Sequence, residues 1–203
     1  MGEAKIDERS DPEQLRVFMQ KVLRDARALE KMLEEGRFEK GSRRIGAEQE
    51  LFLVDAARRP APVSLELLKA IDDRHFTTEL ASFNLEINLD PLEIGADTLG
   101  LLERQLNELL TKAREAAAGL GVDVVMTGIL PTLEKADLAR DYMTPVPRYF
   151  ALADAVYQLR GGDFEIHVKG RDELTLTHDS VMAEACNTSF QLHFQVEPSS
   201  FAR

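Results

Sequence analysis

The sequence is poor in cysteine and has no long apolar run, and both features narrow the possible settings of the protein. Cys186 is the single cysteine among 203 residues. No intrachain disulfide is therefore possible, and we expect a reducing, cytoplasmic setting. No stretch approaches the roughly 18 apolar residues of a membrane-spanning helix. Residues 1–10 lack the apolar segment of a secretory signal. We expect no membrane partner.

The charge balance argues against nucleic acid as a partner. Asp and Glu number 36 against 25 Lys and Arg, which gives a net charge of -11. Phosphate contacts need clustered basic side chains, and this chain has an excess of acids. A hydrophobic content of 44% is sufficient for a core. The chain is therefore expected to form one folded domain, or one lobe of a larger protein.

Four common catalytic or binding motifs are missing. The sequence has no phosphate-binding G-x-x-x-x-G-K-[ST] loop and no G-x-G-x-x-G after a strand. It also lacks a cysteine pair for zinc and a G-x-S-x-G nucleophile turn. Any chemistry should therefore rest on carboxylates.

Apolar periodicity predicts an α+β fold with a mixed or antiparallel sheet and helices packed on one of its faces. Asp11 is a candidate cap for the first helix, and Gly36 a candidate end. Listed by residue number, the pattern favours helices over 12–36, 64–71, 96–119 and 145–159, strands over 45–54, 79–89, 122–126 and 186–196, and a hairpin over 164–177.

Two strands carry acidic side chains on one face. Glu48 and Glu50 are two positions apart, so both project from the same side of their strand, a spacing that suits ligands of divalent cations. Glu86 lies on a similar polar face of the second strand. Glu79 precedes Glu86 by seven positions, which places the two on opposite faces unless a bulge or strand start intervenes. The alternative for all four is an ordinary solvated strand face.

Two further segments carry candidate binding residues. In the last strand Gln191, His193 and Gln195 share one face, and the large apolar residues share the other. Arg148 follows two prolines at the start of a helix, where it could bind a carboxylate or a phosphate. A structural histidine and a surface ion pair are the alternatives.

Four segments in this order resemble the glutamate–cysteine ligase superfamily, particularly its plant-type and carboxylate–amine ligase branches. Residues 45–54 are similar to the opening G-x-E-x-E strand of the family, and residues 79–88 resemble its second acidic strand. Residues 143–149 resemble its Met-Pro-x-x-Arg-Tyr segment, and residues 182–196 its Thr-x-Gln-x-Asn strand, with His193 where Asn is common.

The resemblance implies a glutamine-synthetase-like fold, in which a curved, largely antiparallel sheet holds the active site on its concave face. It also implies a reaction that joins a carboxylate to an amine, with ATP as co-substrate and Mg²⁺ as cofactor. The expected partners are ATP, an amino-acid substrate and an amine acceptor, with a homo-oligomer as a further possibility. The roles implied are catalysis for Arg148, substrate or nucleotide binding for Gln191 and His193, and metal binding for Glu48, Glu50, Glu79 and Glu86.

The resemblance divides the chain into a helix and loop over residues 1–40 and the N-terminal portion of a catalytic domain over residues 41–203. Because family members are usually much longer, we expect the sheet to be incomplete and the isolated chain to be an inactive fragment. Two other hypotheses stay open, a nucleotide- or metabolite-binding module without turnover and a metal-dependent hydrolase. A role in glutathione synthesis is part of the first hypothesis.

Overall fold

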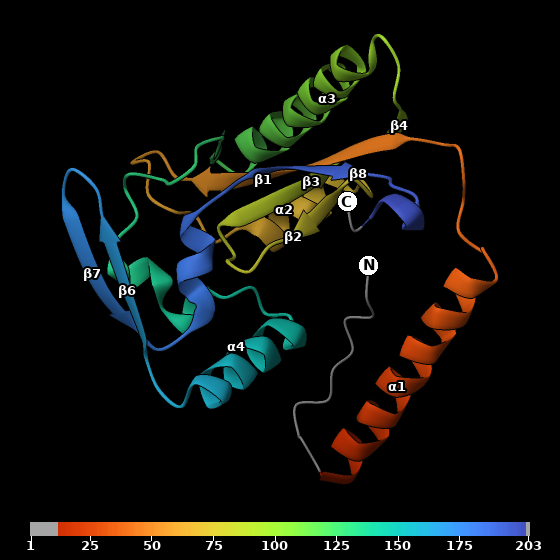
Figure 1. The fold of residues 1–203 in the computed structure, drawn as a ribbon. Coiled ribbons are helices and arrows are strands. Elements are labelled where there is room, and N and C mark those ends of the chain that lie inside the picture. The colour runs from red at the N-terminus through yellow and green to blue at the C-terminus, as the bar shows by residue number, and fades with distance from the viewer. Residues whose placement is uncertain (1–11, 202–203) are drawn as a thin grey trace.

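The computed structural model describes residues 12–201, and Figure 1 shows their arrangement. Asp11, the candidate helix cap, lies outside these residues. The helices are α1 (Pro12–Glu34), α2 (Ser64–Ile71), α3 (Thr98–Gly119) and α4 (Pro147–Arg160). The strands are β1 (Arg44–Val54), β2 (Phe76–Thr78), β3 (Asn84–Asn88), β4 (Leu92–Glu93), β5 (Asp123–Val125), β6 (Phe164–Lys169), β7 (Glu173–His178) and β8 (Phe190–Phe194).

Strand β1 is the centre of the main sheet. Strands β3 and β4 pair with one of its edges, and β8 and β5 pair with the other. Strand β2 lies outside β3, and each of these pairings is antiparallel. The α+β prediction is therefore confirmed. None of the helices in the described part of the chain combines the length and hydropathy that a bilayer crossing requires.

One face of the sheet is covered by α2 and α3, which share a hydrophobic core with it. Figure 1 shows α3 lying across this face. Odd-numbered residues of β1 point into this layer because side chains alternate along a strand. They meet the apolar stripe of α3, whose buried members recur at helical spacing. The buried residues that β1 and α3 contribute are Ile45, Ala47, Leu51, Leu53, Leu102, Leu109, Leu110, Ala113 and Ala117.

A second core lies on the opposite face, at one end of β1. Phe52 and Val54 are fully buried there against Phe83, and Tyr149 and Ala153 of α4 join them. The expectation that all helices pack on one face of the sheet is therefore wrong. Burial on both sides explains why the alternating pattern of β1 ends at its last four residues, which are all buried. The remainder of this face is left for polar side chains.

The predicted strand over 79–89 is wrong in its first half. The chain forms β2, turns through residues 79–83 and returns as β3, which pairs antiparallel with β2. Contacts with a distant segment hold this turn, because Thr144 N donates to Leu80 O at 2.9 Å and Ser82 N to Tyr142 O at 2.8 Å. The other predicted helices and strands are present, with ends that differ by a few residues, and the 164–177 hairpin forms a separate two-stranded sheet from β6 and β7.

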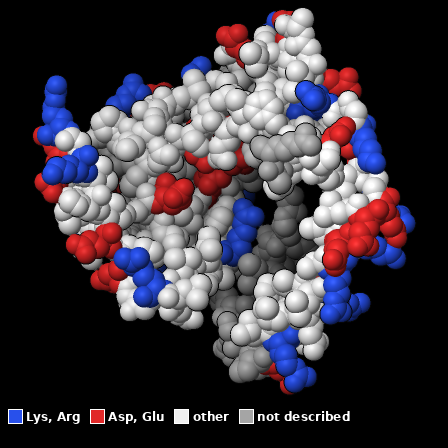
Figure 2. Space-filling model, in the orientation of Figure 1, with Lys and Arg blue, Asp and Glu red and all other residues white. Residues whose placement is uncertain are grey.

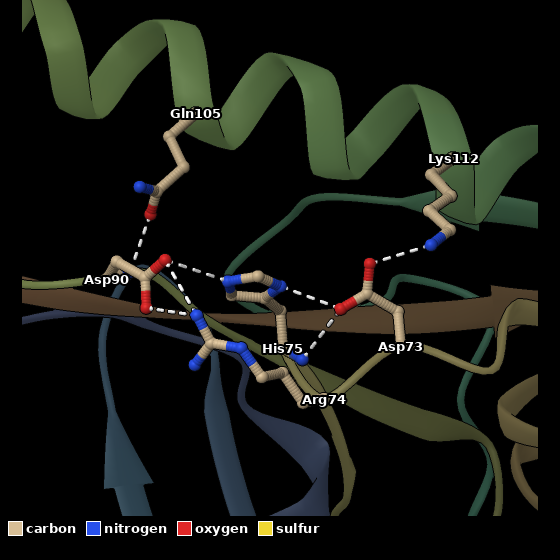
Figure 3. Close-up of polar contacts among 6 residues, drawn as sticks. All are labelled: Asp73, Arg74, His75, Asp90, Gln105 and Lys112. Atoms are coloured by element: carbon tan, nitrogen blue, oxygen red, sulfur yellow. Dashed lines mark hydrogen bonds and ion pairs between the residues drawn. The ribbon is translucent and has the colours of Figure 1, made fainter.

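His75, just before β2, lies between two carboxylates (Figure 3). Its Nδ1 is 2.7 Å from Asp73 Oδ1, and its Nε2 is 3.1 Å from Asp90 Oδ2. Lys112 of α3 reaches Asp73 at 2.7 Å, and Arg74 reaches Asp90 at 2.8 Å. This cluster ties α3 to the segments that precede β2 and follow β3, which lie together at the end of the β2–β3 pair away from its turn.

The cluster holds its members in their charged forms. The hydrogen bond with Asp90, with help from Asp73, raises the pKa of His75 against the opposing effect of burial. The hydrogen bond with Lys112 is the largest cause that lowers the pKa of Asp73, and the one with His75 lowers the pKa of Asp90. The pKa of His75 is higher in the folded state than in the unfolded state. His75 therefore stabilises the fold fully below its unfolded pKa, and this stabilisation is lost as pH rises through its folded pKa.

We predict that His75→Gln lowers the free energy of unfolding by about 1 kcal/mol near pH 5.5, and that this loss shrinks as pH rises through the folded pKa of His75. Denaturant unfolding of both proteins across this range measures the difference. His167→Gln is the control, because His167 is exposed and makes a surface ion pair with Glu173 in the separate hairpin. A loss that is independent of pH would assign His75 a packing role only.

Candidate active site

Polar side chains converge on the sheet face that α2 and α3 leave open. Within β1, Glu48 and Glu50 point to this side, and their neighbours in register are polar too. Glu50 stands opposite Glu86 of β3, and Glu48 stands opposite Gln191 of β8. Figure 2 shows acidic side chains gathered at the middle of this face, beside a hollow with a basic side chain at its edge. Three strands therefore contribute to one polar surface.

Glu50, Glu79 and Glu86 form a compact cluster, called the triad below. One carboxylate oxygen of each lies within 4.8 Å of the other two, and all three residues are partly buried. Of the four glutamates that the family resemblance implies as metal ligands, Glu50, Glu79 and Glu86 are brought together, and Glu48 is not part of this cluster. Three carboxylates at this separation offer the oxygen donors that Mg²⁺ and Ca²⁺ prefer.

Glu79 joins the triad although its spacing from Glu86 is odd. The spacing argument requires one continuous strand, and the structure instead has a turn between β2 and β3. Glu79 is the first residue of that turn, so the alternation of β3 does not extend to it. Thr144 Oγ1 donates to Glu79 O at 2.6 Å and fixes its backbone. The spacing argument allowed an exception if a strand started between Glu79 and Glu86. β3 starts there, at Asn84.

Hydrogen bonds orient the other two carboxylates of the triad. Glu50 Oε2 accepts from the backbone N of Ser189 at 2.7 Å and from its Oγ at 3.2 Å. Glu50 Oε1 accepts from Gln191 Nε2 at 3.2 Å. Glu86 Oε1 accepts from Asn88 Nδ2 at 2.6 Å. Glu50 is thus held between β1 and β8, with its direction set by three donors.

Burial, together with the neighbouring carboxylates of the triad, changes the protonation of one member. Burial is the largest cause that raises the pKa of Glu79, followed by its hydrogen bond with Glu86 and the charge of Glu86, and the pKa reaches about 8. The charge of Glu50 acts in the same direction. At neutral pH Glu79 is therefore protonated in the absence of a cation. A divalent cation among the three oxygens would replace that proton.

Asn84 lies close to the triad and has a side-chain oxygen without a hydrogen-bond partner. Its side chain is 3% exposed, and its Nδ2 makes a long bond of 3.4 Å to Leu51 O. Its Oδ1 is buried and accepts no hydrogen bond. Together with Glu50 and Glu79 it lines a cavity of about 50 Å³, which is large enough for a few water molecules. A buried carbonyl oxygen without a donor beside three carboxylates suits a cation or its bound water.

Glu48 lies outside the triad and pairs with His193. The two side chains approach to 3.2 Å between Oε2 and Nε2, and His193 is more exposed than Glu48. An imidazole nitrogen and a carboxylate oxygen on neighbouring strands form a second potential pair of ligands on this face. His193, predicted to line the substrate or nucleotide region, is on the predicted face and contacts an acid there.

Arg148 lies near the triad and is held by its neighbour. Its guanidinium donates to Tyr149 Oη at 2.8 Å and lies over the Tyr149 ring at 4.8 Å. Tyr149 in turn donates to Thr78 O at 3.0 Å, in the strand that ends beside Glu79. The hydrogen bond with Tyr149 is the largest cause that raises the pKa of Arg148, and the charges of Glu79 and Glu86 contribute. Its Nε is buried without a partner.

Sequence reasoning missed three residues of this site. Asn84 and Ser189 each stand two positions before a predicted site residue, Glu86 and Gln191 respectively, and strand alternation could have identified both. Tyr149 is the tyrosine of the Met-Pro-x-x-Arg-Tyr resemblance, but its role in holding Arg148 depends on the packing of α4 against the end of β2.

The sequence model of glutamate-cysteine ligase family 2 matches residues 44–202. The chain belongs to this family. The match begins at the first residue of β1 and includes every strand of the described structure, whereas α1 lies before it. A search of curated proteins finds no match to the chain. Membership of the family confirms the predicted resemblance and indicates an enzyme of the ligase type.

The donor set of this site fits the divalent cation that the family resemblance implies. Three carboxylate oxygens lie within reach of one ion. The pKa of Glu79 is about 8 because burial and the neighbouring Glu86 disfavour its negative charge, and the Asn84 carbonyl oxygen lacks a donor. A cation would satisfy both groups at once. The donors present therefore fit a divalent cation.

We predict that Glu79→Gln stabilises the metal-free protein at alkaline pH. The folded state retains a proton on Glu79 that the unfolded state releases above about pH 4.5, so folding stability falls as pH rises from there to about 8. The glutamine variant lacks this fall and should exceed the wild type by about 2 kcal/mol at pH 8, while the two agree near pH 4. Denaturant unfolding with a chelator present measures it.

Glu66→Gln is the control, because Glu66 is an exposed acid of α2. It should leave the pH dependence of the wild type unchanged. Unfolding curves of wild type and Glu79→Gln that coincide at pH 8 would show that Glu79 carries no retained proton.

Proposed function

We propose that this chain carries the metal- and nucleotide-binding part of an ATP- and Mg²⁺-dependent ligase that joins a carboxylate to an amine through an acyl phosphate. The triad is the observation that supports the proposal most directly, since its three carboxylates suit hard cations. Family membership supports a glutamate substrate, whose side-chain carboxylate would be activated. By the same resemblance, we propose that the sheet is part of a glutamine-synthetase-like sheet.

The residues that would hold the cations are distributed over two positions. Glu50, Glu79 and Glu86 would provide the first. Glu48 and His193 would contribute to a second on the same face. When bound, Mg²⁺ would neutralise the negative charges of the triphosphate and the substrate carboxylate, which otherwise repel each other.

The other side chains would orient the substrates. Arg148 would hold an anionic group, because its guanidinium is fixed by Tyr149 beside the acidic face. Gln191 is tied to Glu50 through its amide nitrogen, which leaves its carbonyl oxygen free to accept from a substrate amine or a nucleotide. Such chemistry requires positioned charges and no covalent nucleophile.

Calorimetric titration of the chain with ATP and Mg²⁺, followed by phosphate release with glutamate and a panel of amines, tests the proposal. Nucleotide binding that depends on Mg²⁺, with amine-dependent release, supports the ligase. Binding without release supports either the alternative of a non-catalytic module or the inactive fragment that the family resemblance predicts. Release of product without ATP supports the hydrolase. Failure to bind Mg²⁺ or ATP would overturn the proposal.

We predict that Glu86→Gln weakens Mg²⁺ binding at least tenfold and reduces any amide-forming turnover by roughly two orders of magnitude or more. The amide keeps the shape of the side chain and removes the charge. Titration with Mg²⁺ measures the first effect, and phosphate release the second. Glu93→Gln in β4 is the control, since Glu93 is an exposed acid of the same sheet outside the triad. Equal affinities for wild type and Glu86→Gln would contradict the assignment.

We further predict that Asn84→Leu weakens Mg²⁺ binding about tenfold and leaves the metal-free protein as stable as the wild type or more so. Leucine removes a buried oxygen that has no donor, so folding loses little. Asn84→Asp keeps an oxygen at this place and should retain the affinity. Titration with Mg²⁺ and denaturant unfolding separate the two effects. Unchanged affinity in Asn84→Leu would exclude the carbonyl oxygen from the metal centre.

A further inference from the structure

Helix α1 exposes a continuous apolar stripe. Every one of its described side chains is exposed, and Figure 1 shows the helix standing apart from the sheet and its covering helices. Its large apolar side chains are 40–59% exposed, namely Leu15, Val17, Phe18, Met19, Val22, Leu23, Leu29, Met32 and Leu33. An amphipathic helix gains most of its stability from packing that stripe against a partner.

The stripe has the spacing of a coiled coil. Successive members follow at intervals of four, three, four, three and four residues, which keeps them on one narrow face of the helix. This alternation assigns them to the two core positions of a heptad repeat. The core residues are Leu15, Met19, Val22, Ala26, Leu29 and Leu33.

We propose that α1 pairs with α1 of a second copy of this chain as an antiparallel two-helix coiled coil. In that arrangement the core layers join Leu15 to Leu33 of the second copy and Met19 to Leu29. Val22 and Ala26 form the central layers, where small side chains let the helices approach. A second copy supplies the same stripe, so each helix would cover the other along its whole length.

The charges beside the stripe are what select a second copy and an antiparallel direction. Arg16 and Glu30 occupy the same heptad position, two heptads apart, on one flank of the core. In an antiparallel pair, equivalent flanks face each other, so Arg16 of each helix would meet Glu30 of the other. The two-fold symmetry makes this pair occur twice. Phe18 and Met32 match in the same way on the other flank and extend the apolar contact.

A parallel pair would bring like charges together. It would place Asp25 of one helix beside Glu30 of the other, twice over, and residues 12–34 would offer no opposite charges in exchange. The antiparallel pair brings Asp25 only near its own symmetry mate, and Lys21, four residues earlier on the same flank, offsets that charge. The flanking charges therefore favour the antiparallel direction.

The length of α1 sets the expected affinity of the proposed dimer. A helix of 23 residues is about 35 Å long, and one helix pair of that length lies near the lower end of stable interface sizes. We expect a reversible dimer whose population depends on protein concentration. The inference does not rest on the proposed function, because α1 precedes the part of the chain that matches the family.

Sedimentation velocity of the full chain over a wide concentration range tests the inference. Arg16→Glu and Glu30→Arg should each weaken the dimer about tenfold, because each converts two attractive pairs into two repulsive ones. The double variant, Arg16→Glu with Glu30→Arg, should restore the wild-type affinity, since opposite charges face each other again. Arg24→Glu is the control, because Arg24 lies on the side of the helix opposite the stripe.

Leu29→Asp should leave only monomer, because it buries a charge in the core of the coiled coil. Circular dichroism and thermal unfolding of each variant check that the sheet domain remains folded. A wild-type chain that stays monomeric at all concentrations would overturn the proposal and would indicate a different occupant of the stripe. A dimer that Glu30→Arg strengthens would indicate the parallel arrangement and overturn the antiparallel one. A dimer that none of these variants alters would lie elsewhere on the surface.

Discussion

The antiparallel register between β1 and β3 is the constraint on which the rest of the structure depends. It places Glu50 opposite Glu86, and two carboxylates at neighbouring positions of a sheet repel each other. The pairing persists because the same register buries Leu51, Leu85 and Ile87 completely. A shift by one residue would turn these apolar side chains toward the open face and the acids toward the core. Burial of the apolar face therefore keeps the carboxylates of Glu50 and Glu86 close together despite their repulsion.

That repulsion gives the open face its chemical character. Glu79 retains a proton because burial and the nearby carboxylates disfavour a third negative charge, and Asn84 keeps a carbonyl oxygen buried without a donor. Both features destabilise the metal-free protein slightly, and both would be relieved by a positive charge. Groups that lower the stability of a folded protein are concentrated at binding and catalytic sites. The site is thus better suited to a cation than to water.

The periodicity of apolar residues predicted most of the fold and part of the site. The sequence predicted the helices, β1, the hairpin and the acidic face, because each depends on spacing within a single element. It did not predict the turn over residues 79–83, since that turn is held by contacts with residues 142–144, far along the chain. The position of Glu79, the part of Tyr149 and the second core under Phe52 follow from that tertiary packing. Helix spacing identified α1 but left its exposure unknown, because exposure depends on what else lies nearby.

The anchoring of Glu50 by Ser189 has a consequence for the order in which the protein assembles. These two residues are 139 positions apart, whereas the three carboxylates come from two neighbouring stretches of the chain. Contacts between distant segments form late, because a long loop must close first. We therefore expect the acidic cluster to form before β8 adds its edge, and the docking of β8 to bring in the donors that orient Glu50. On this expectation the sheet is completed at the site itself.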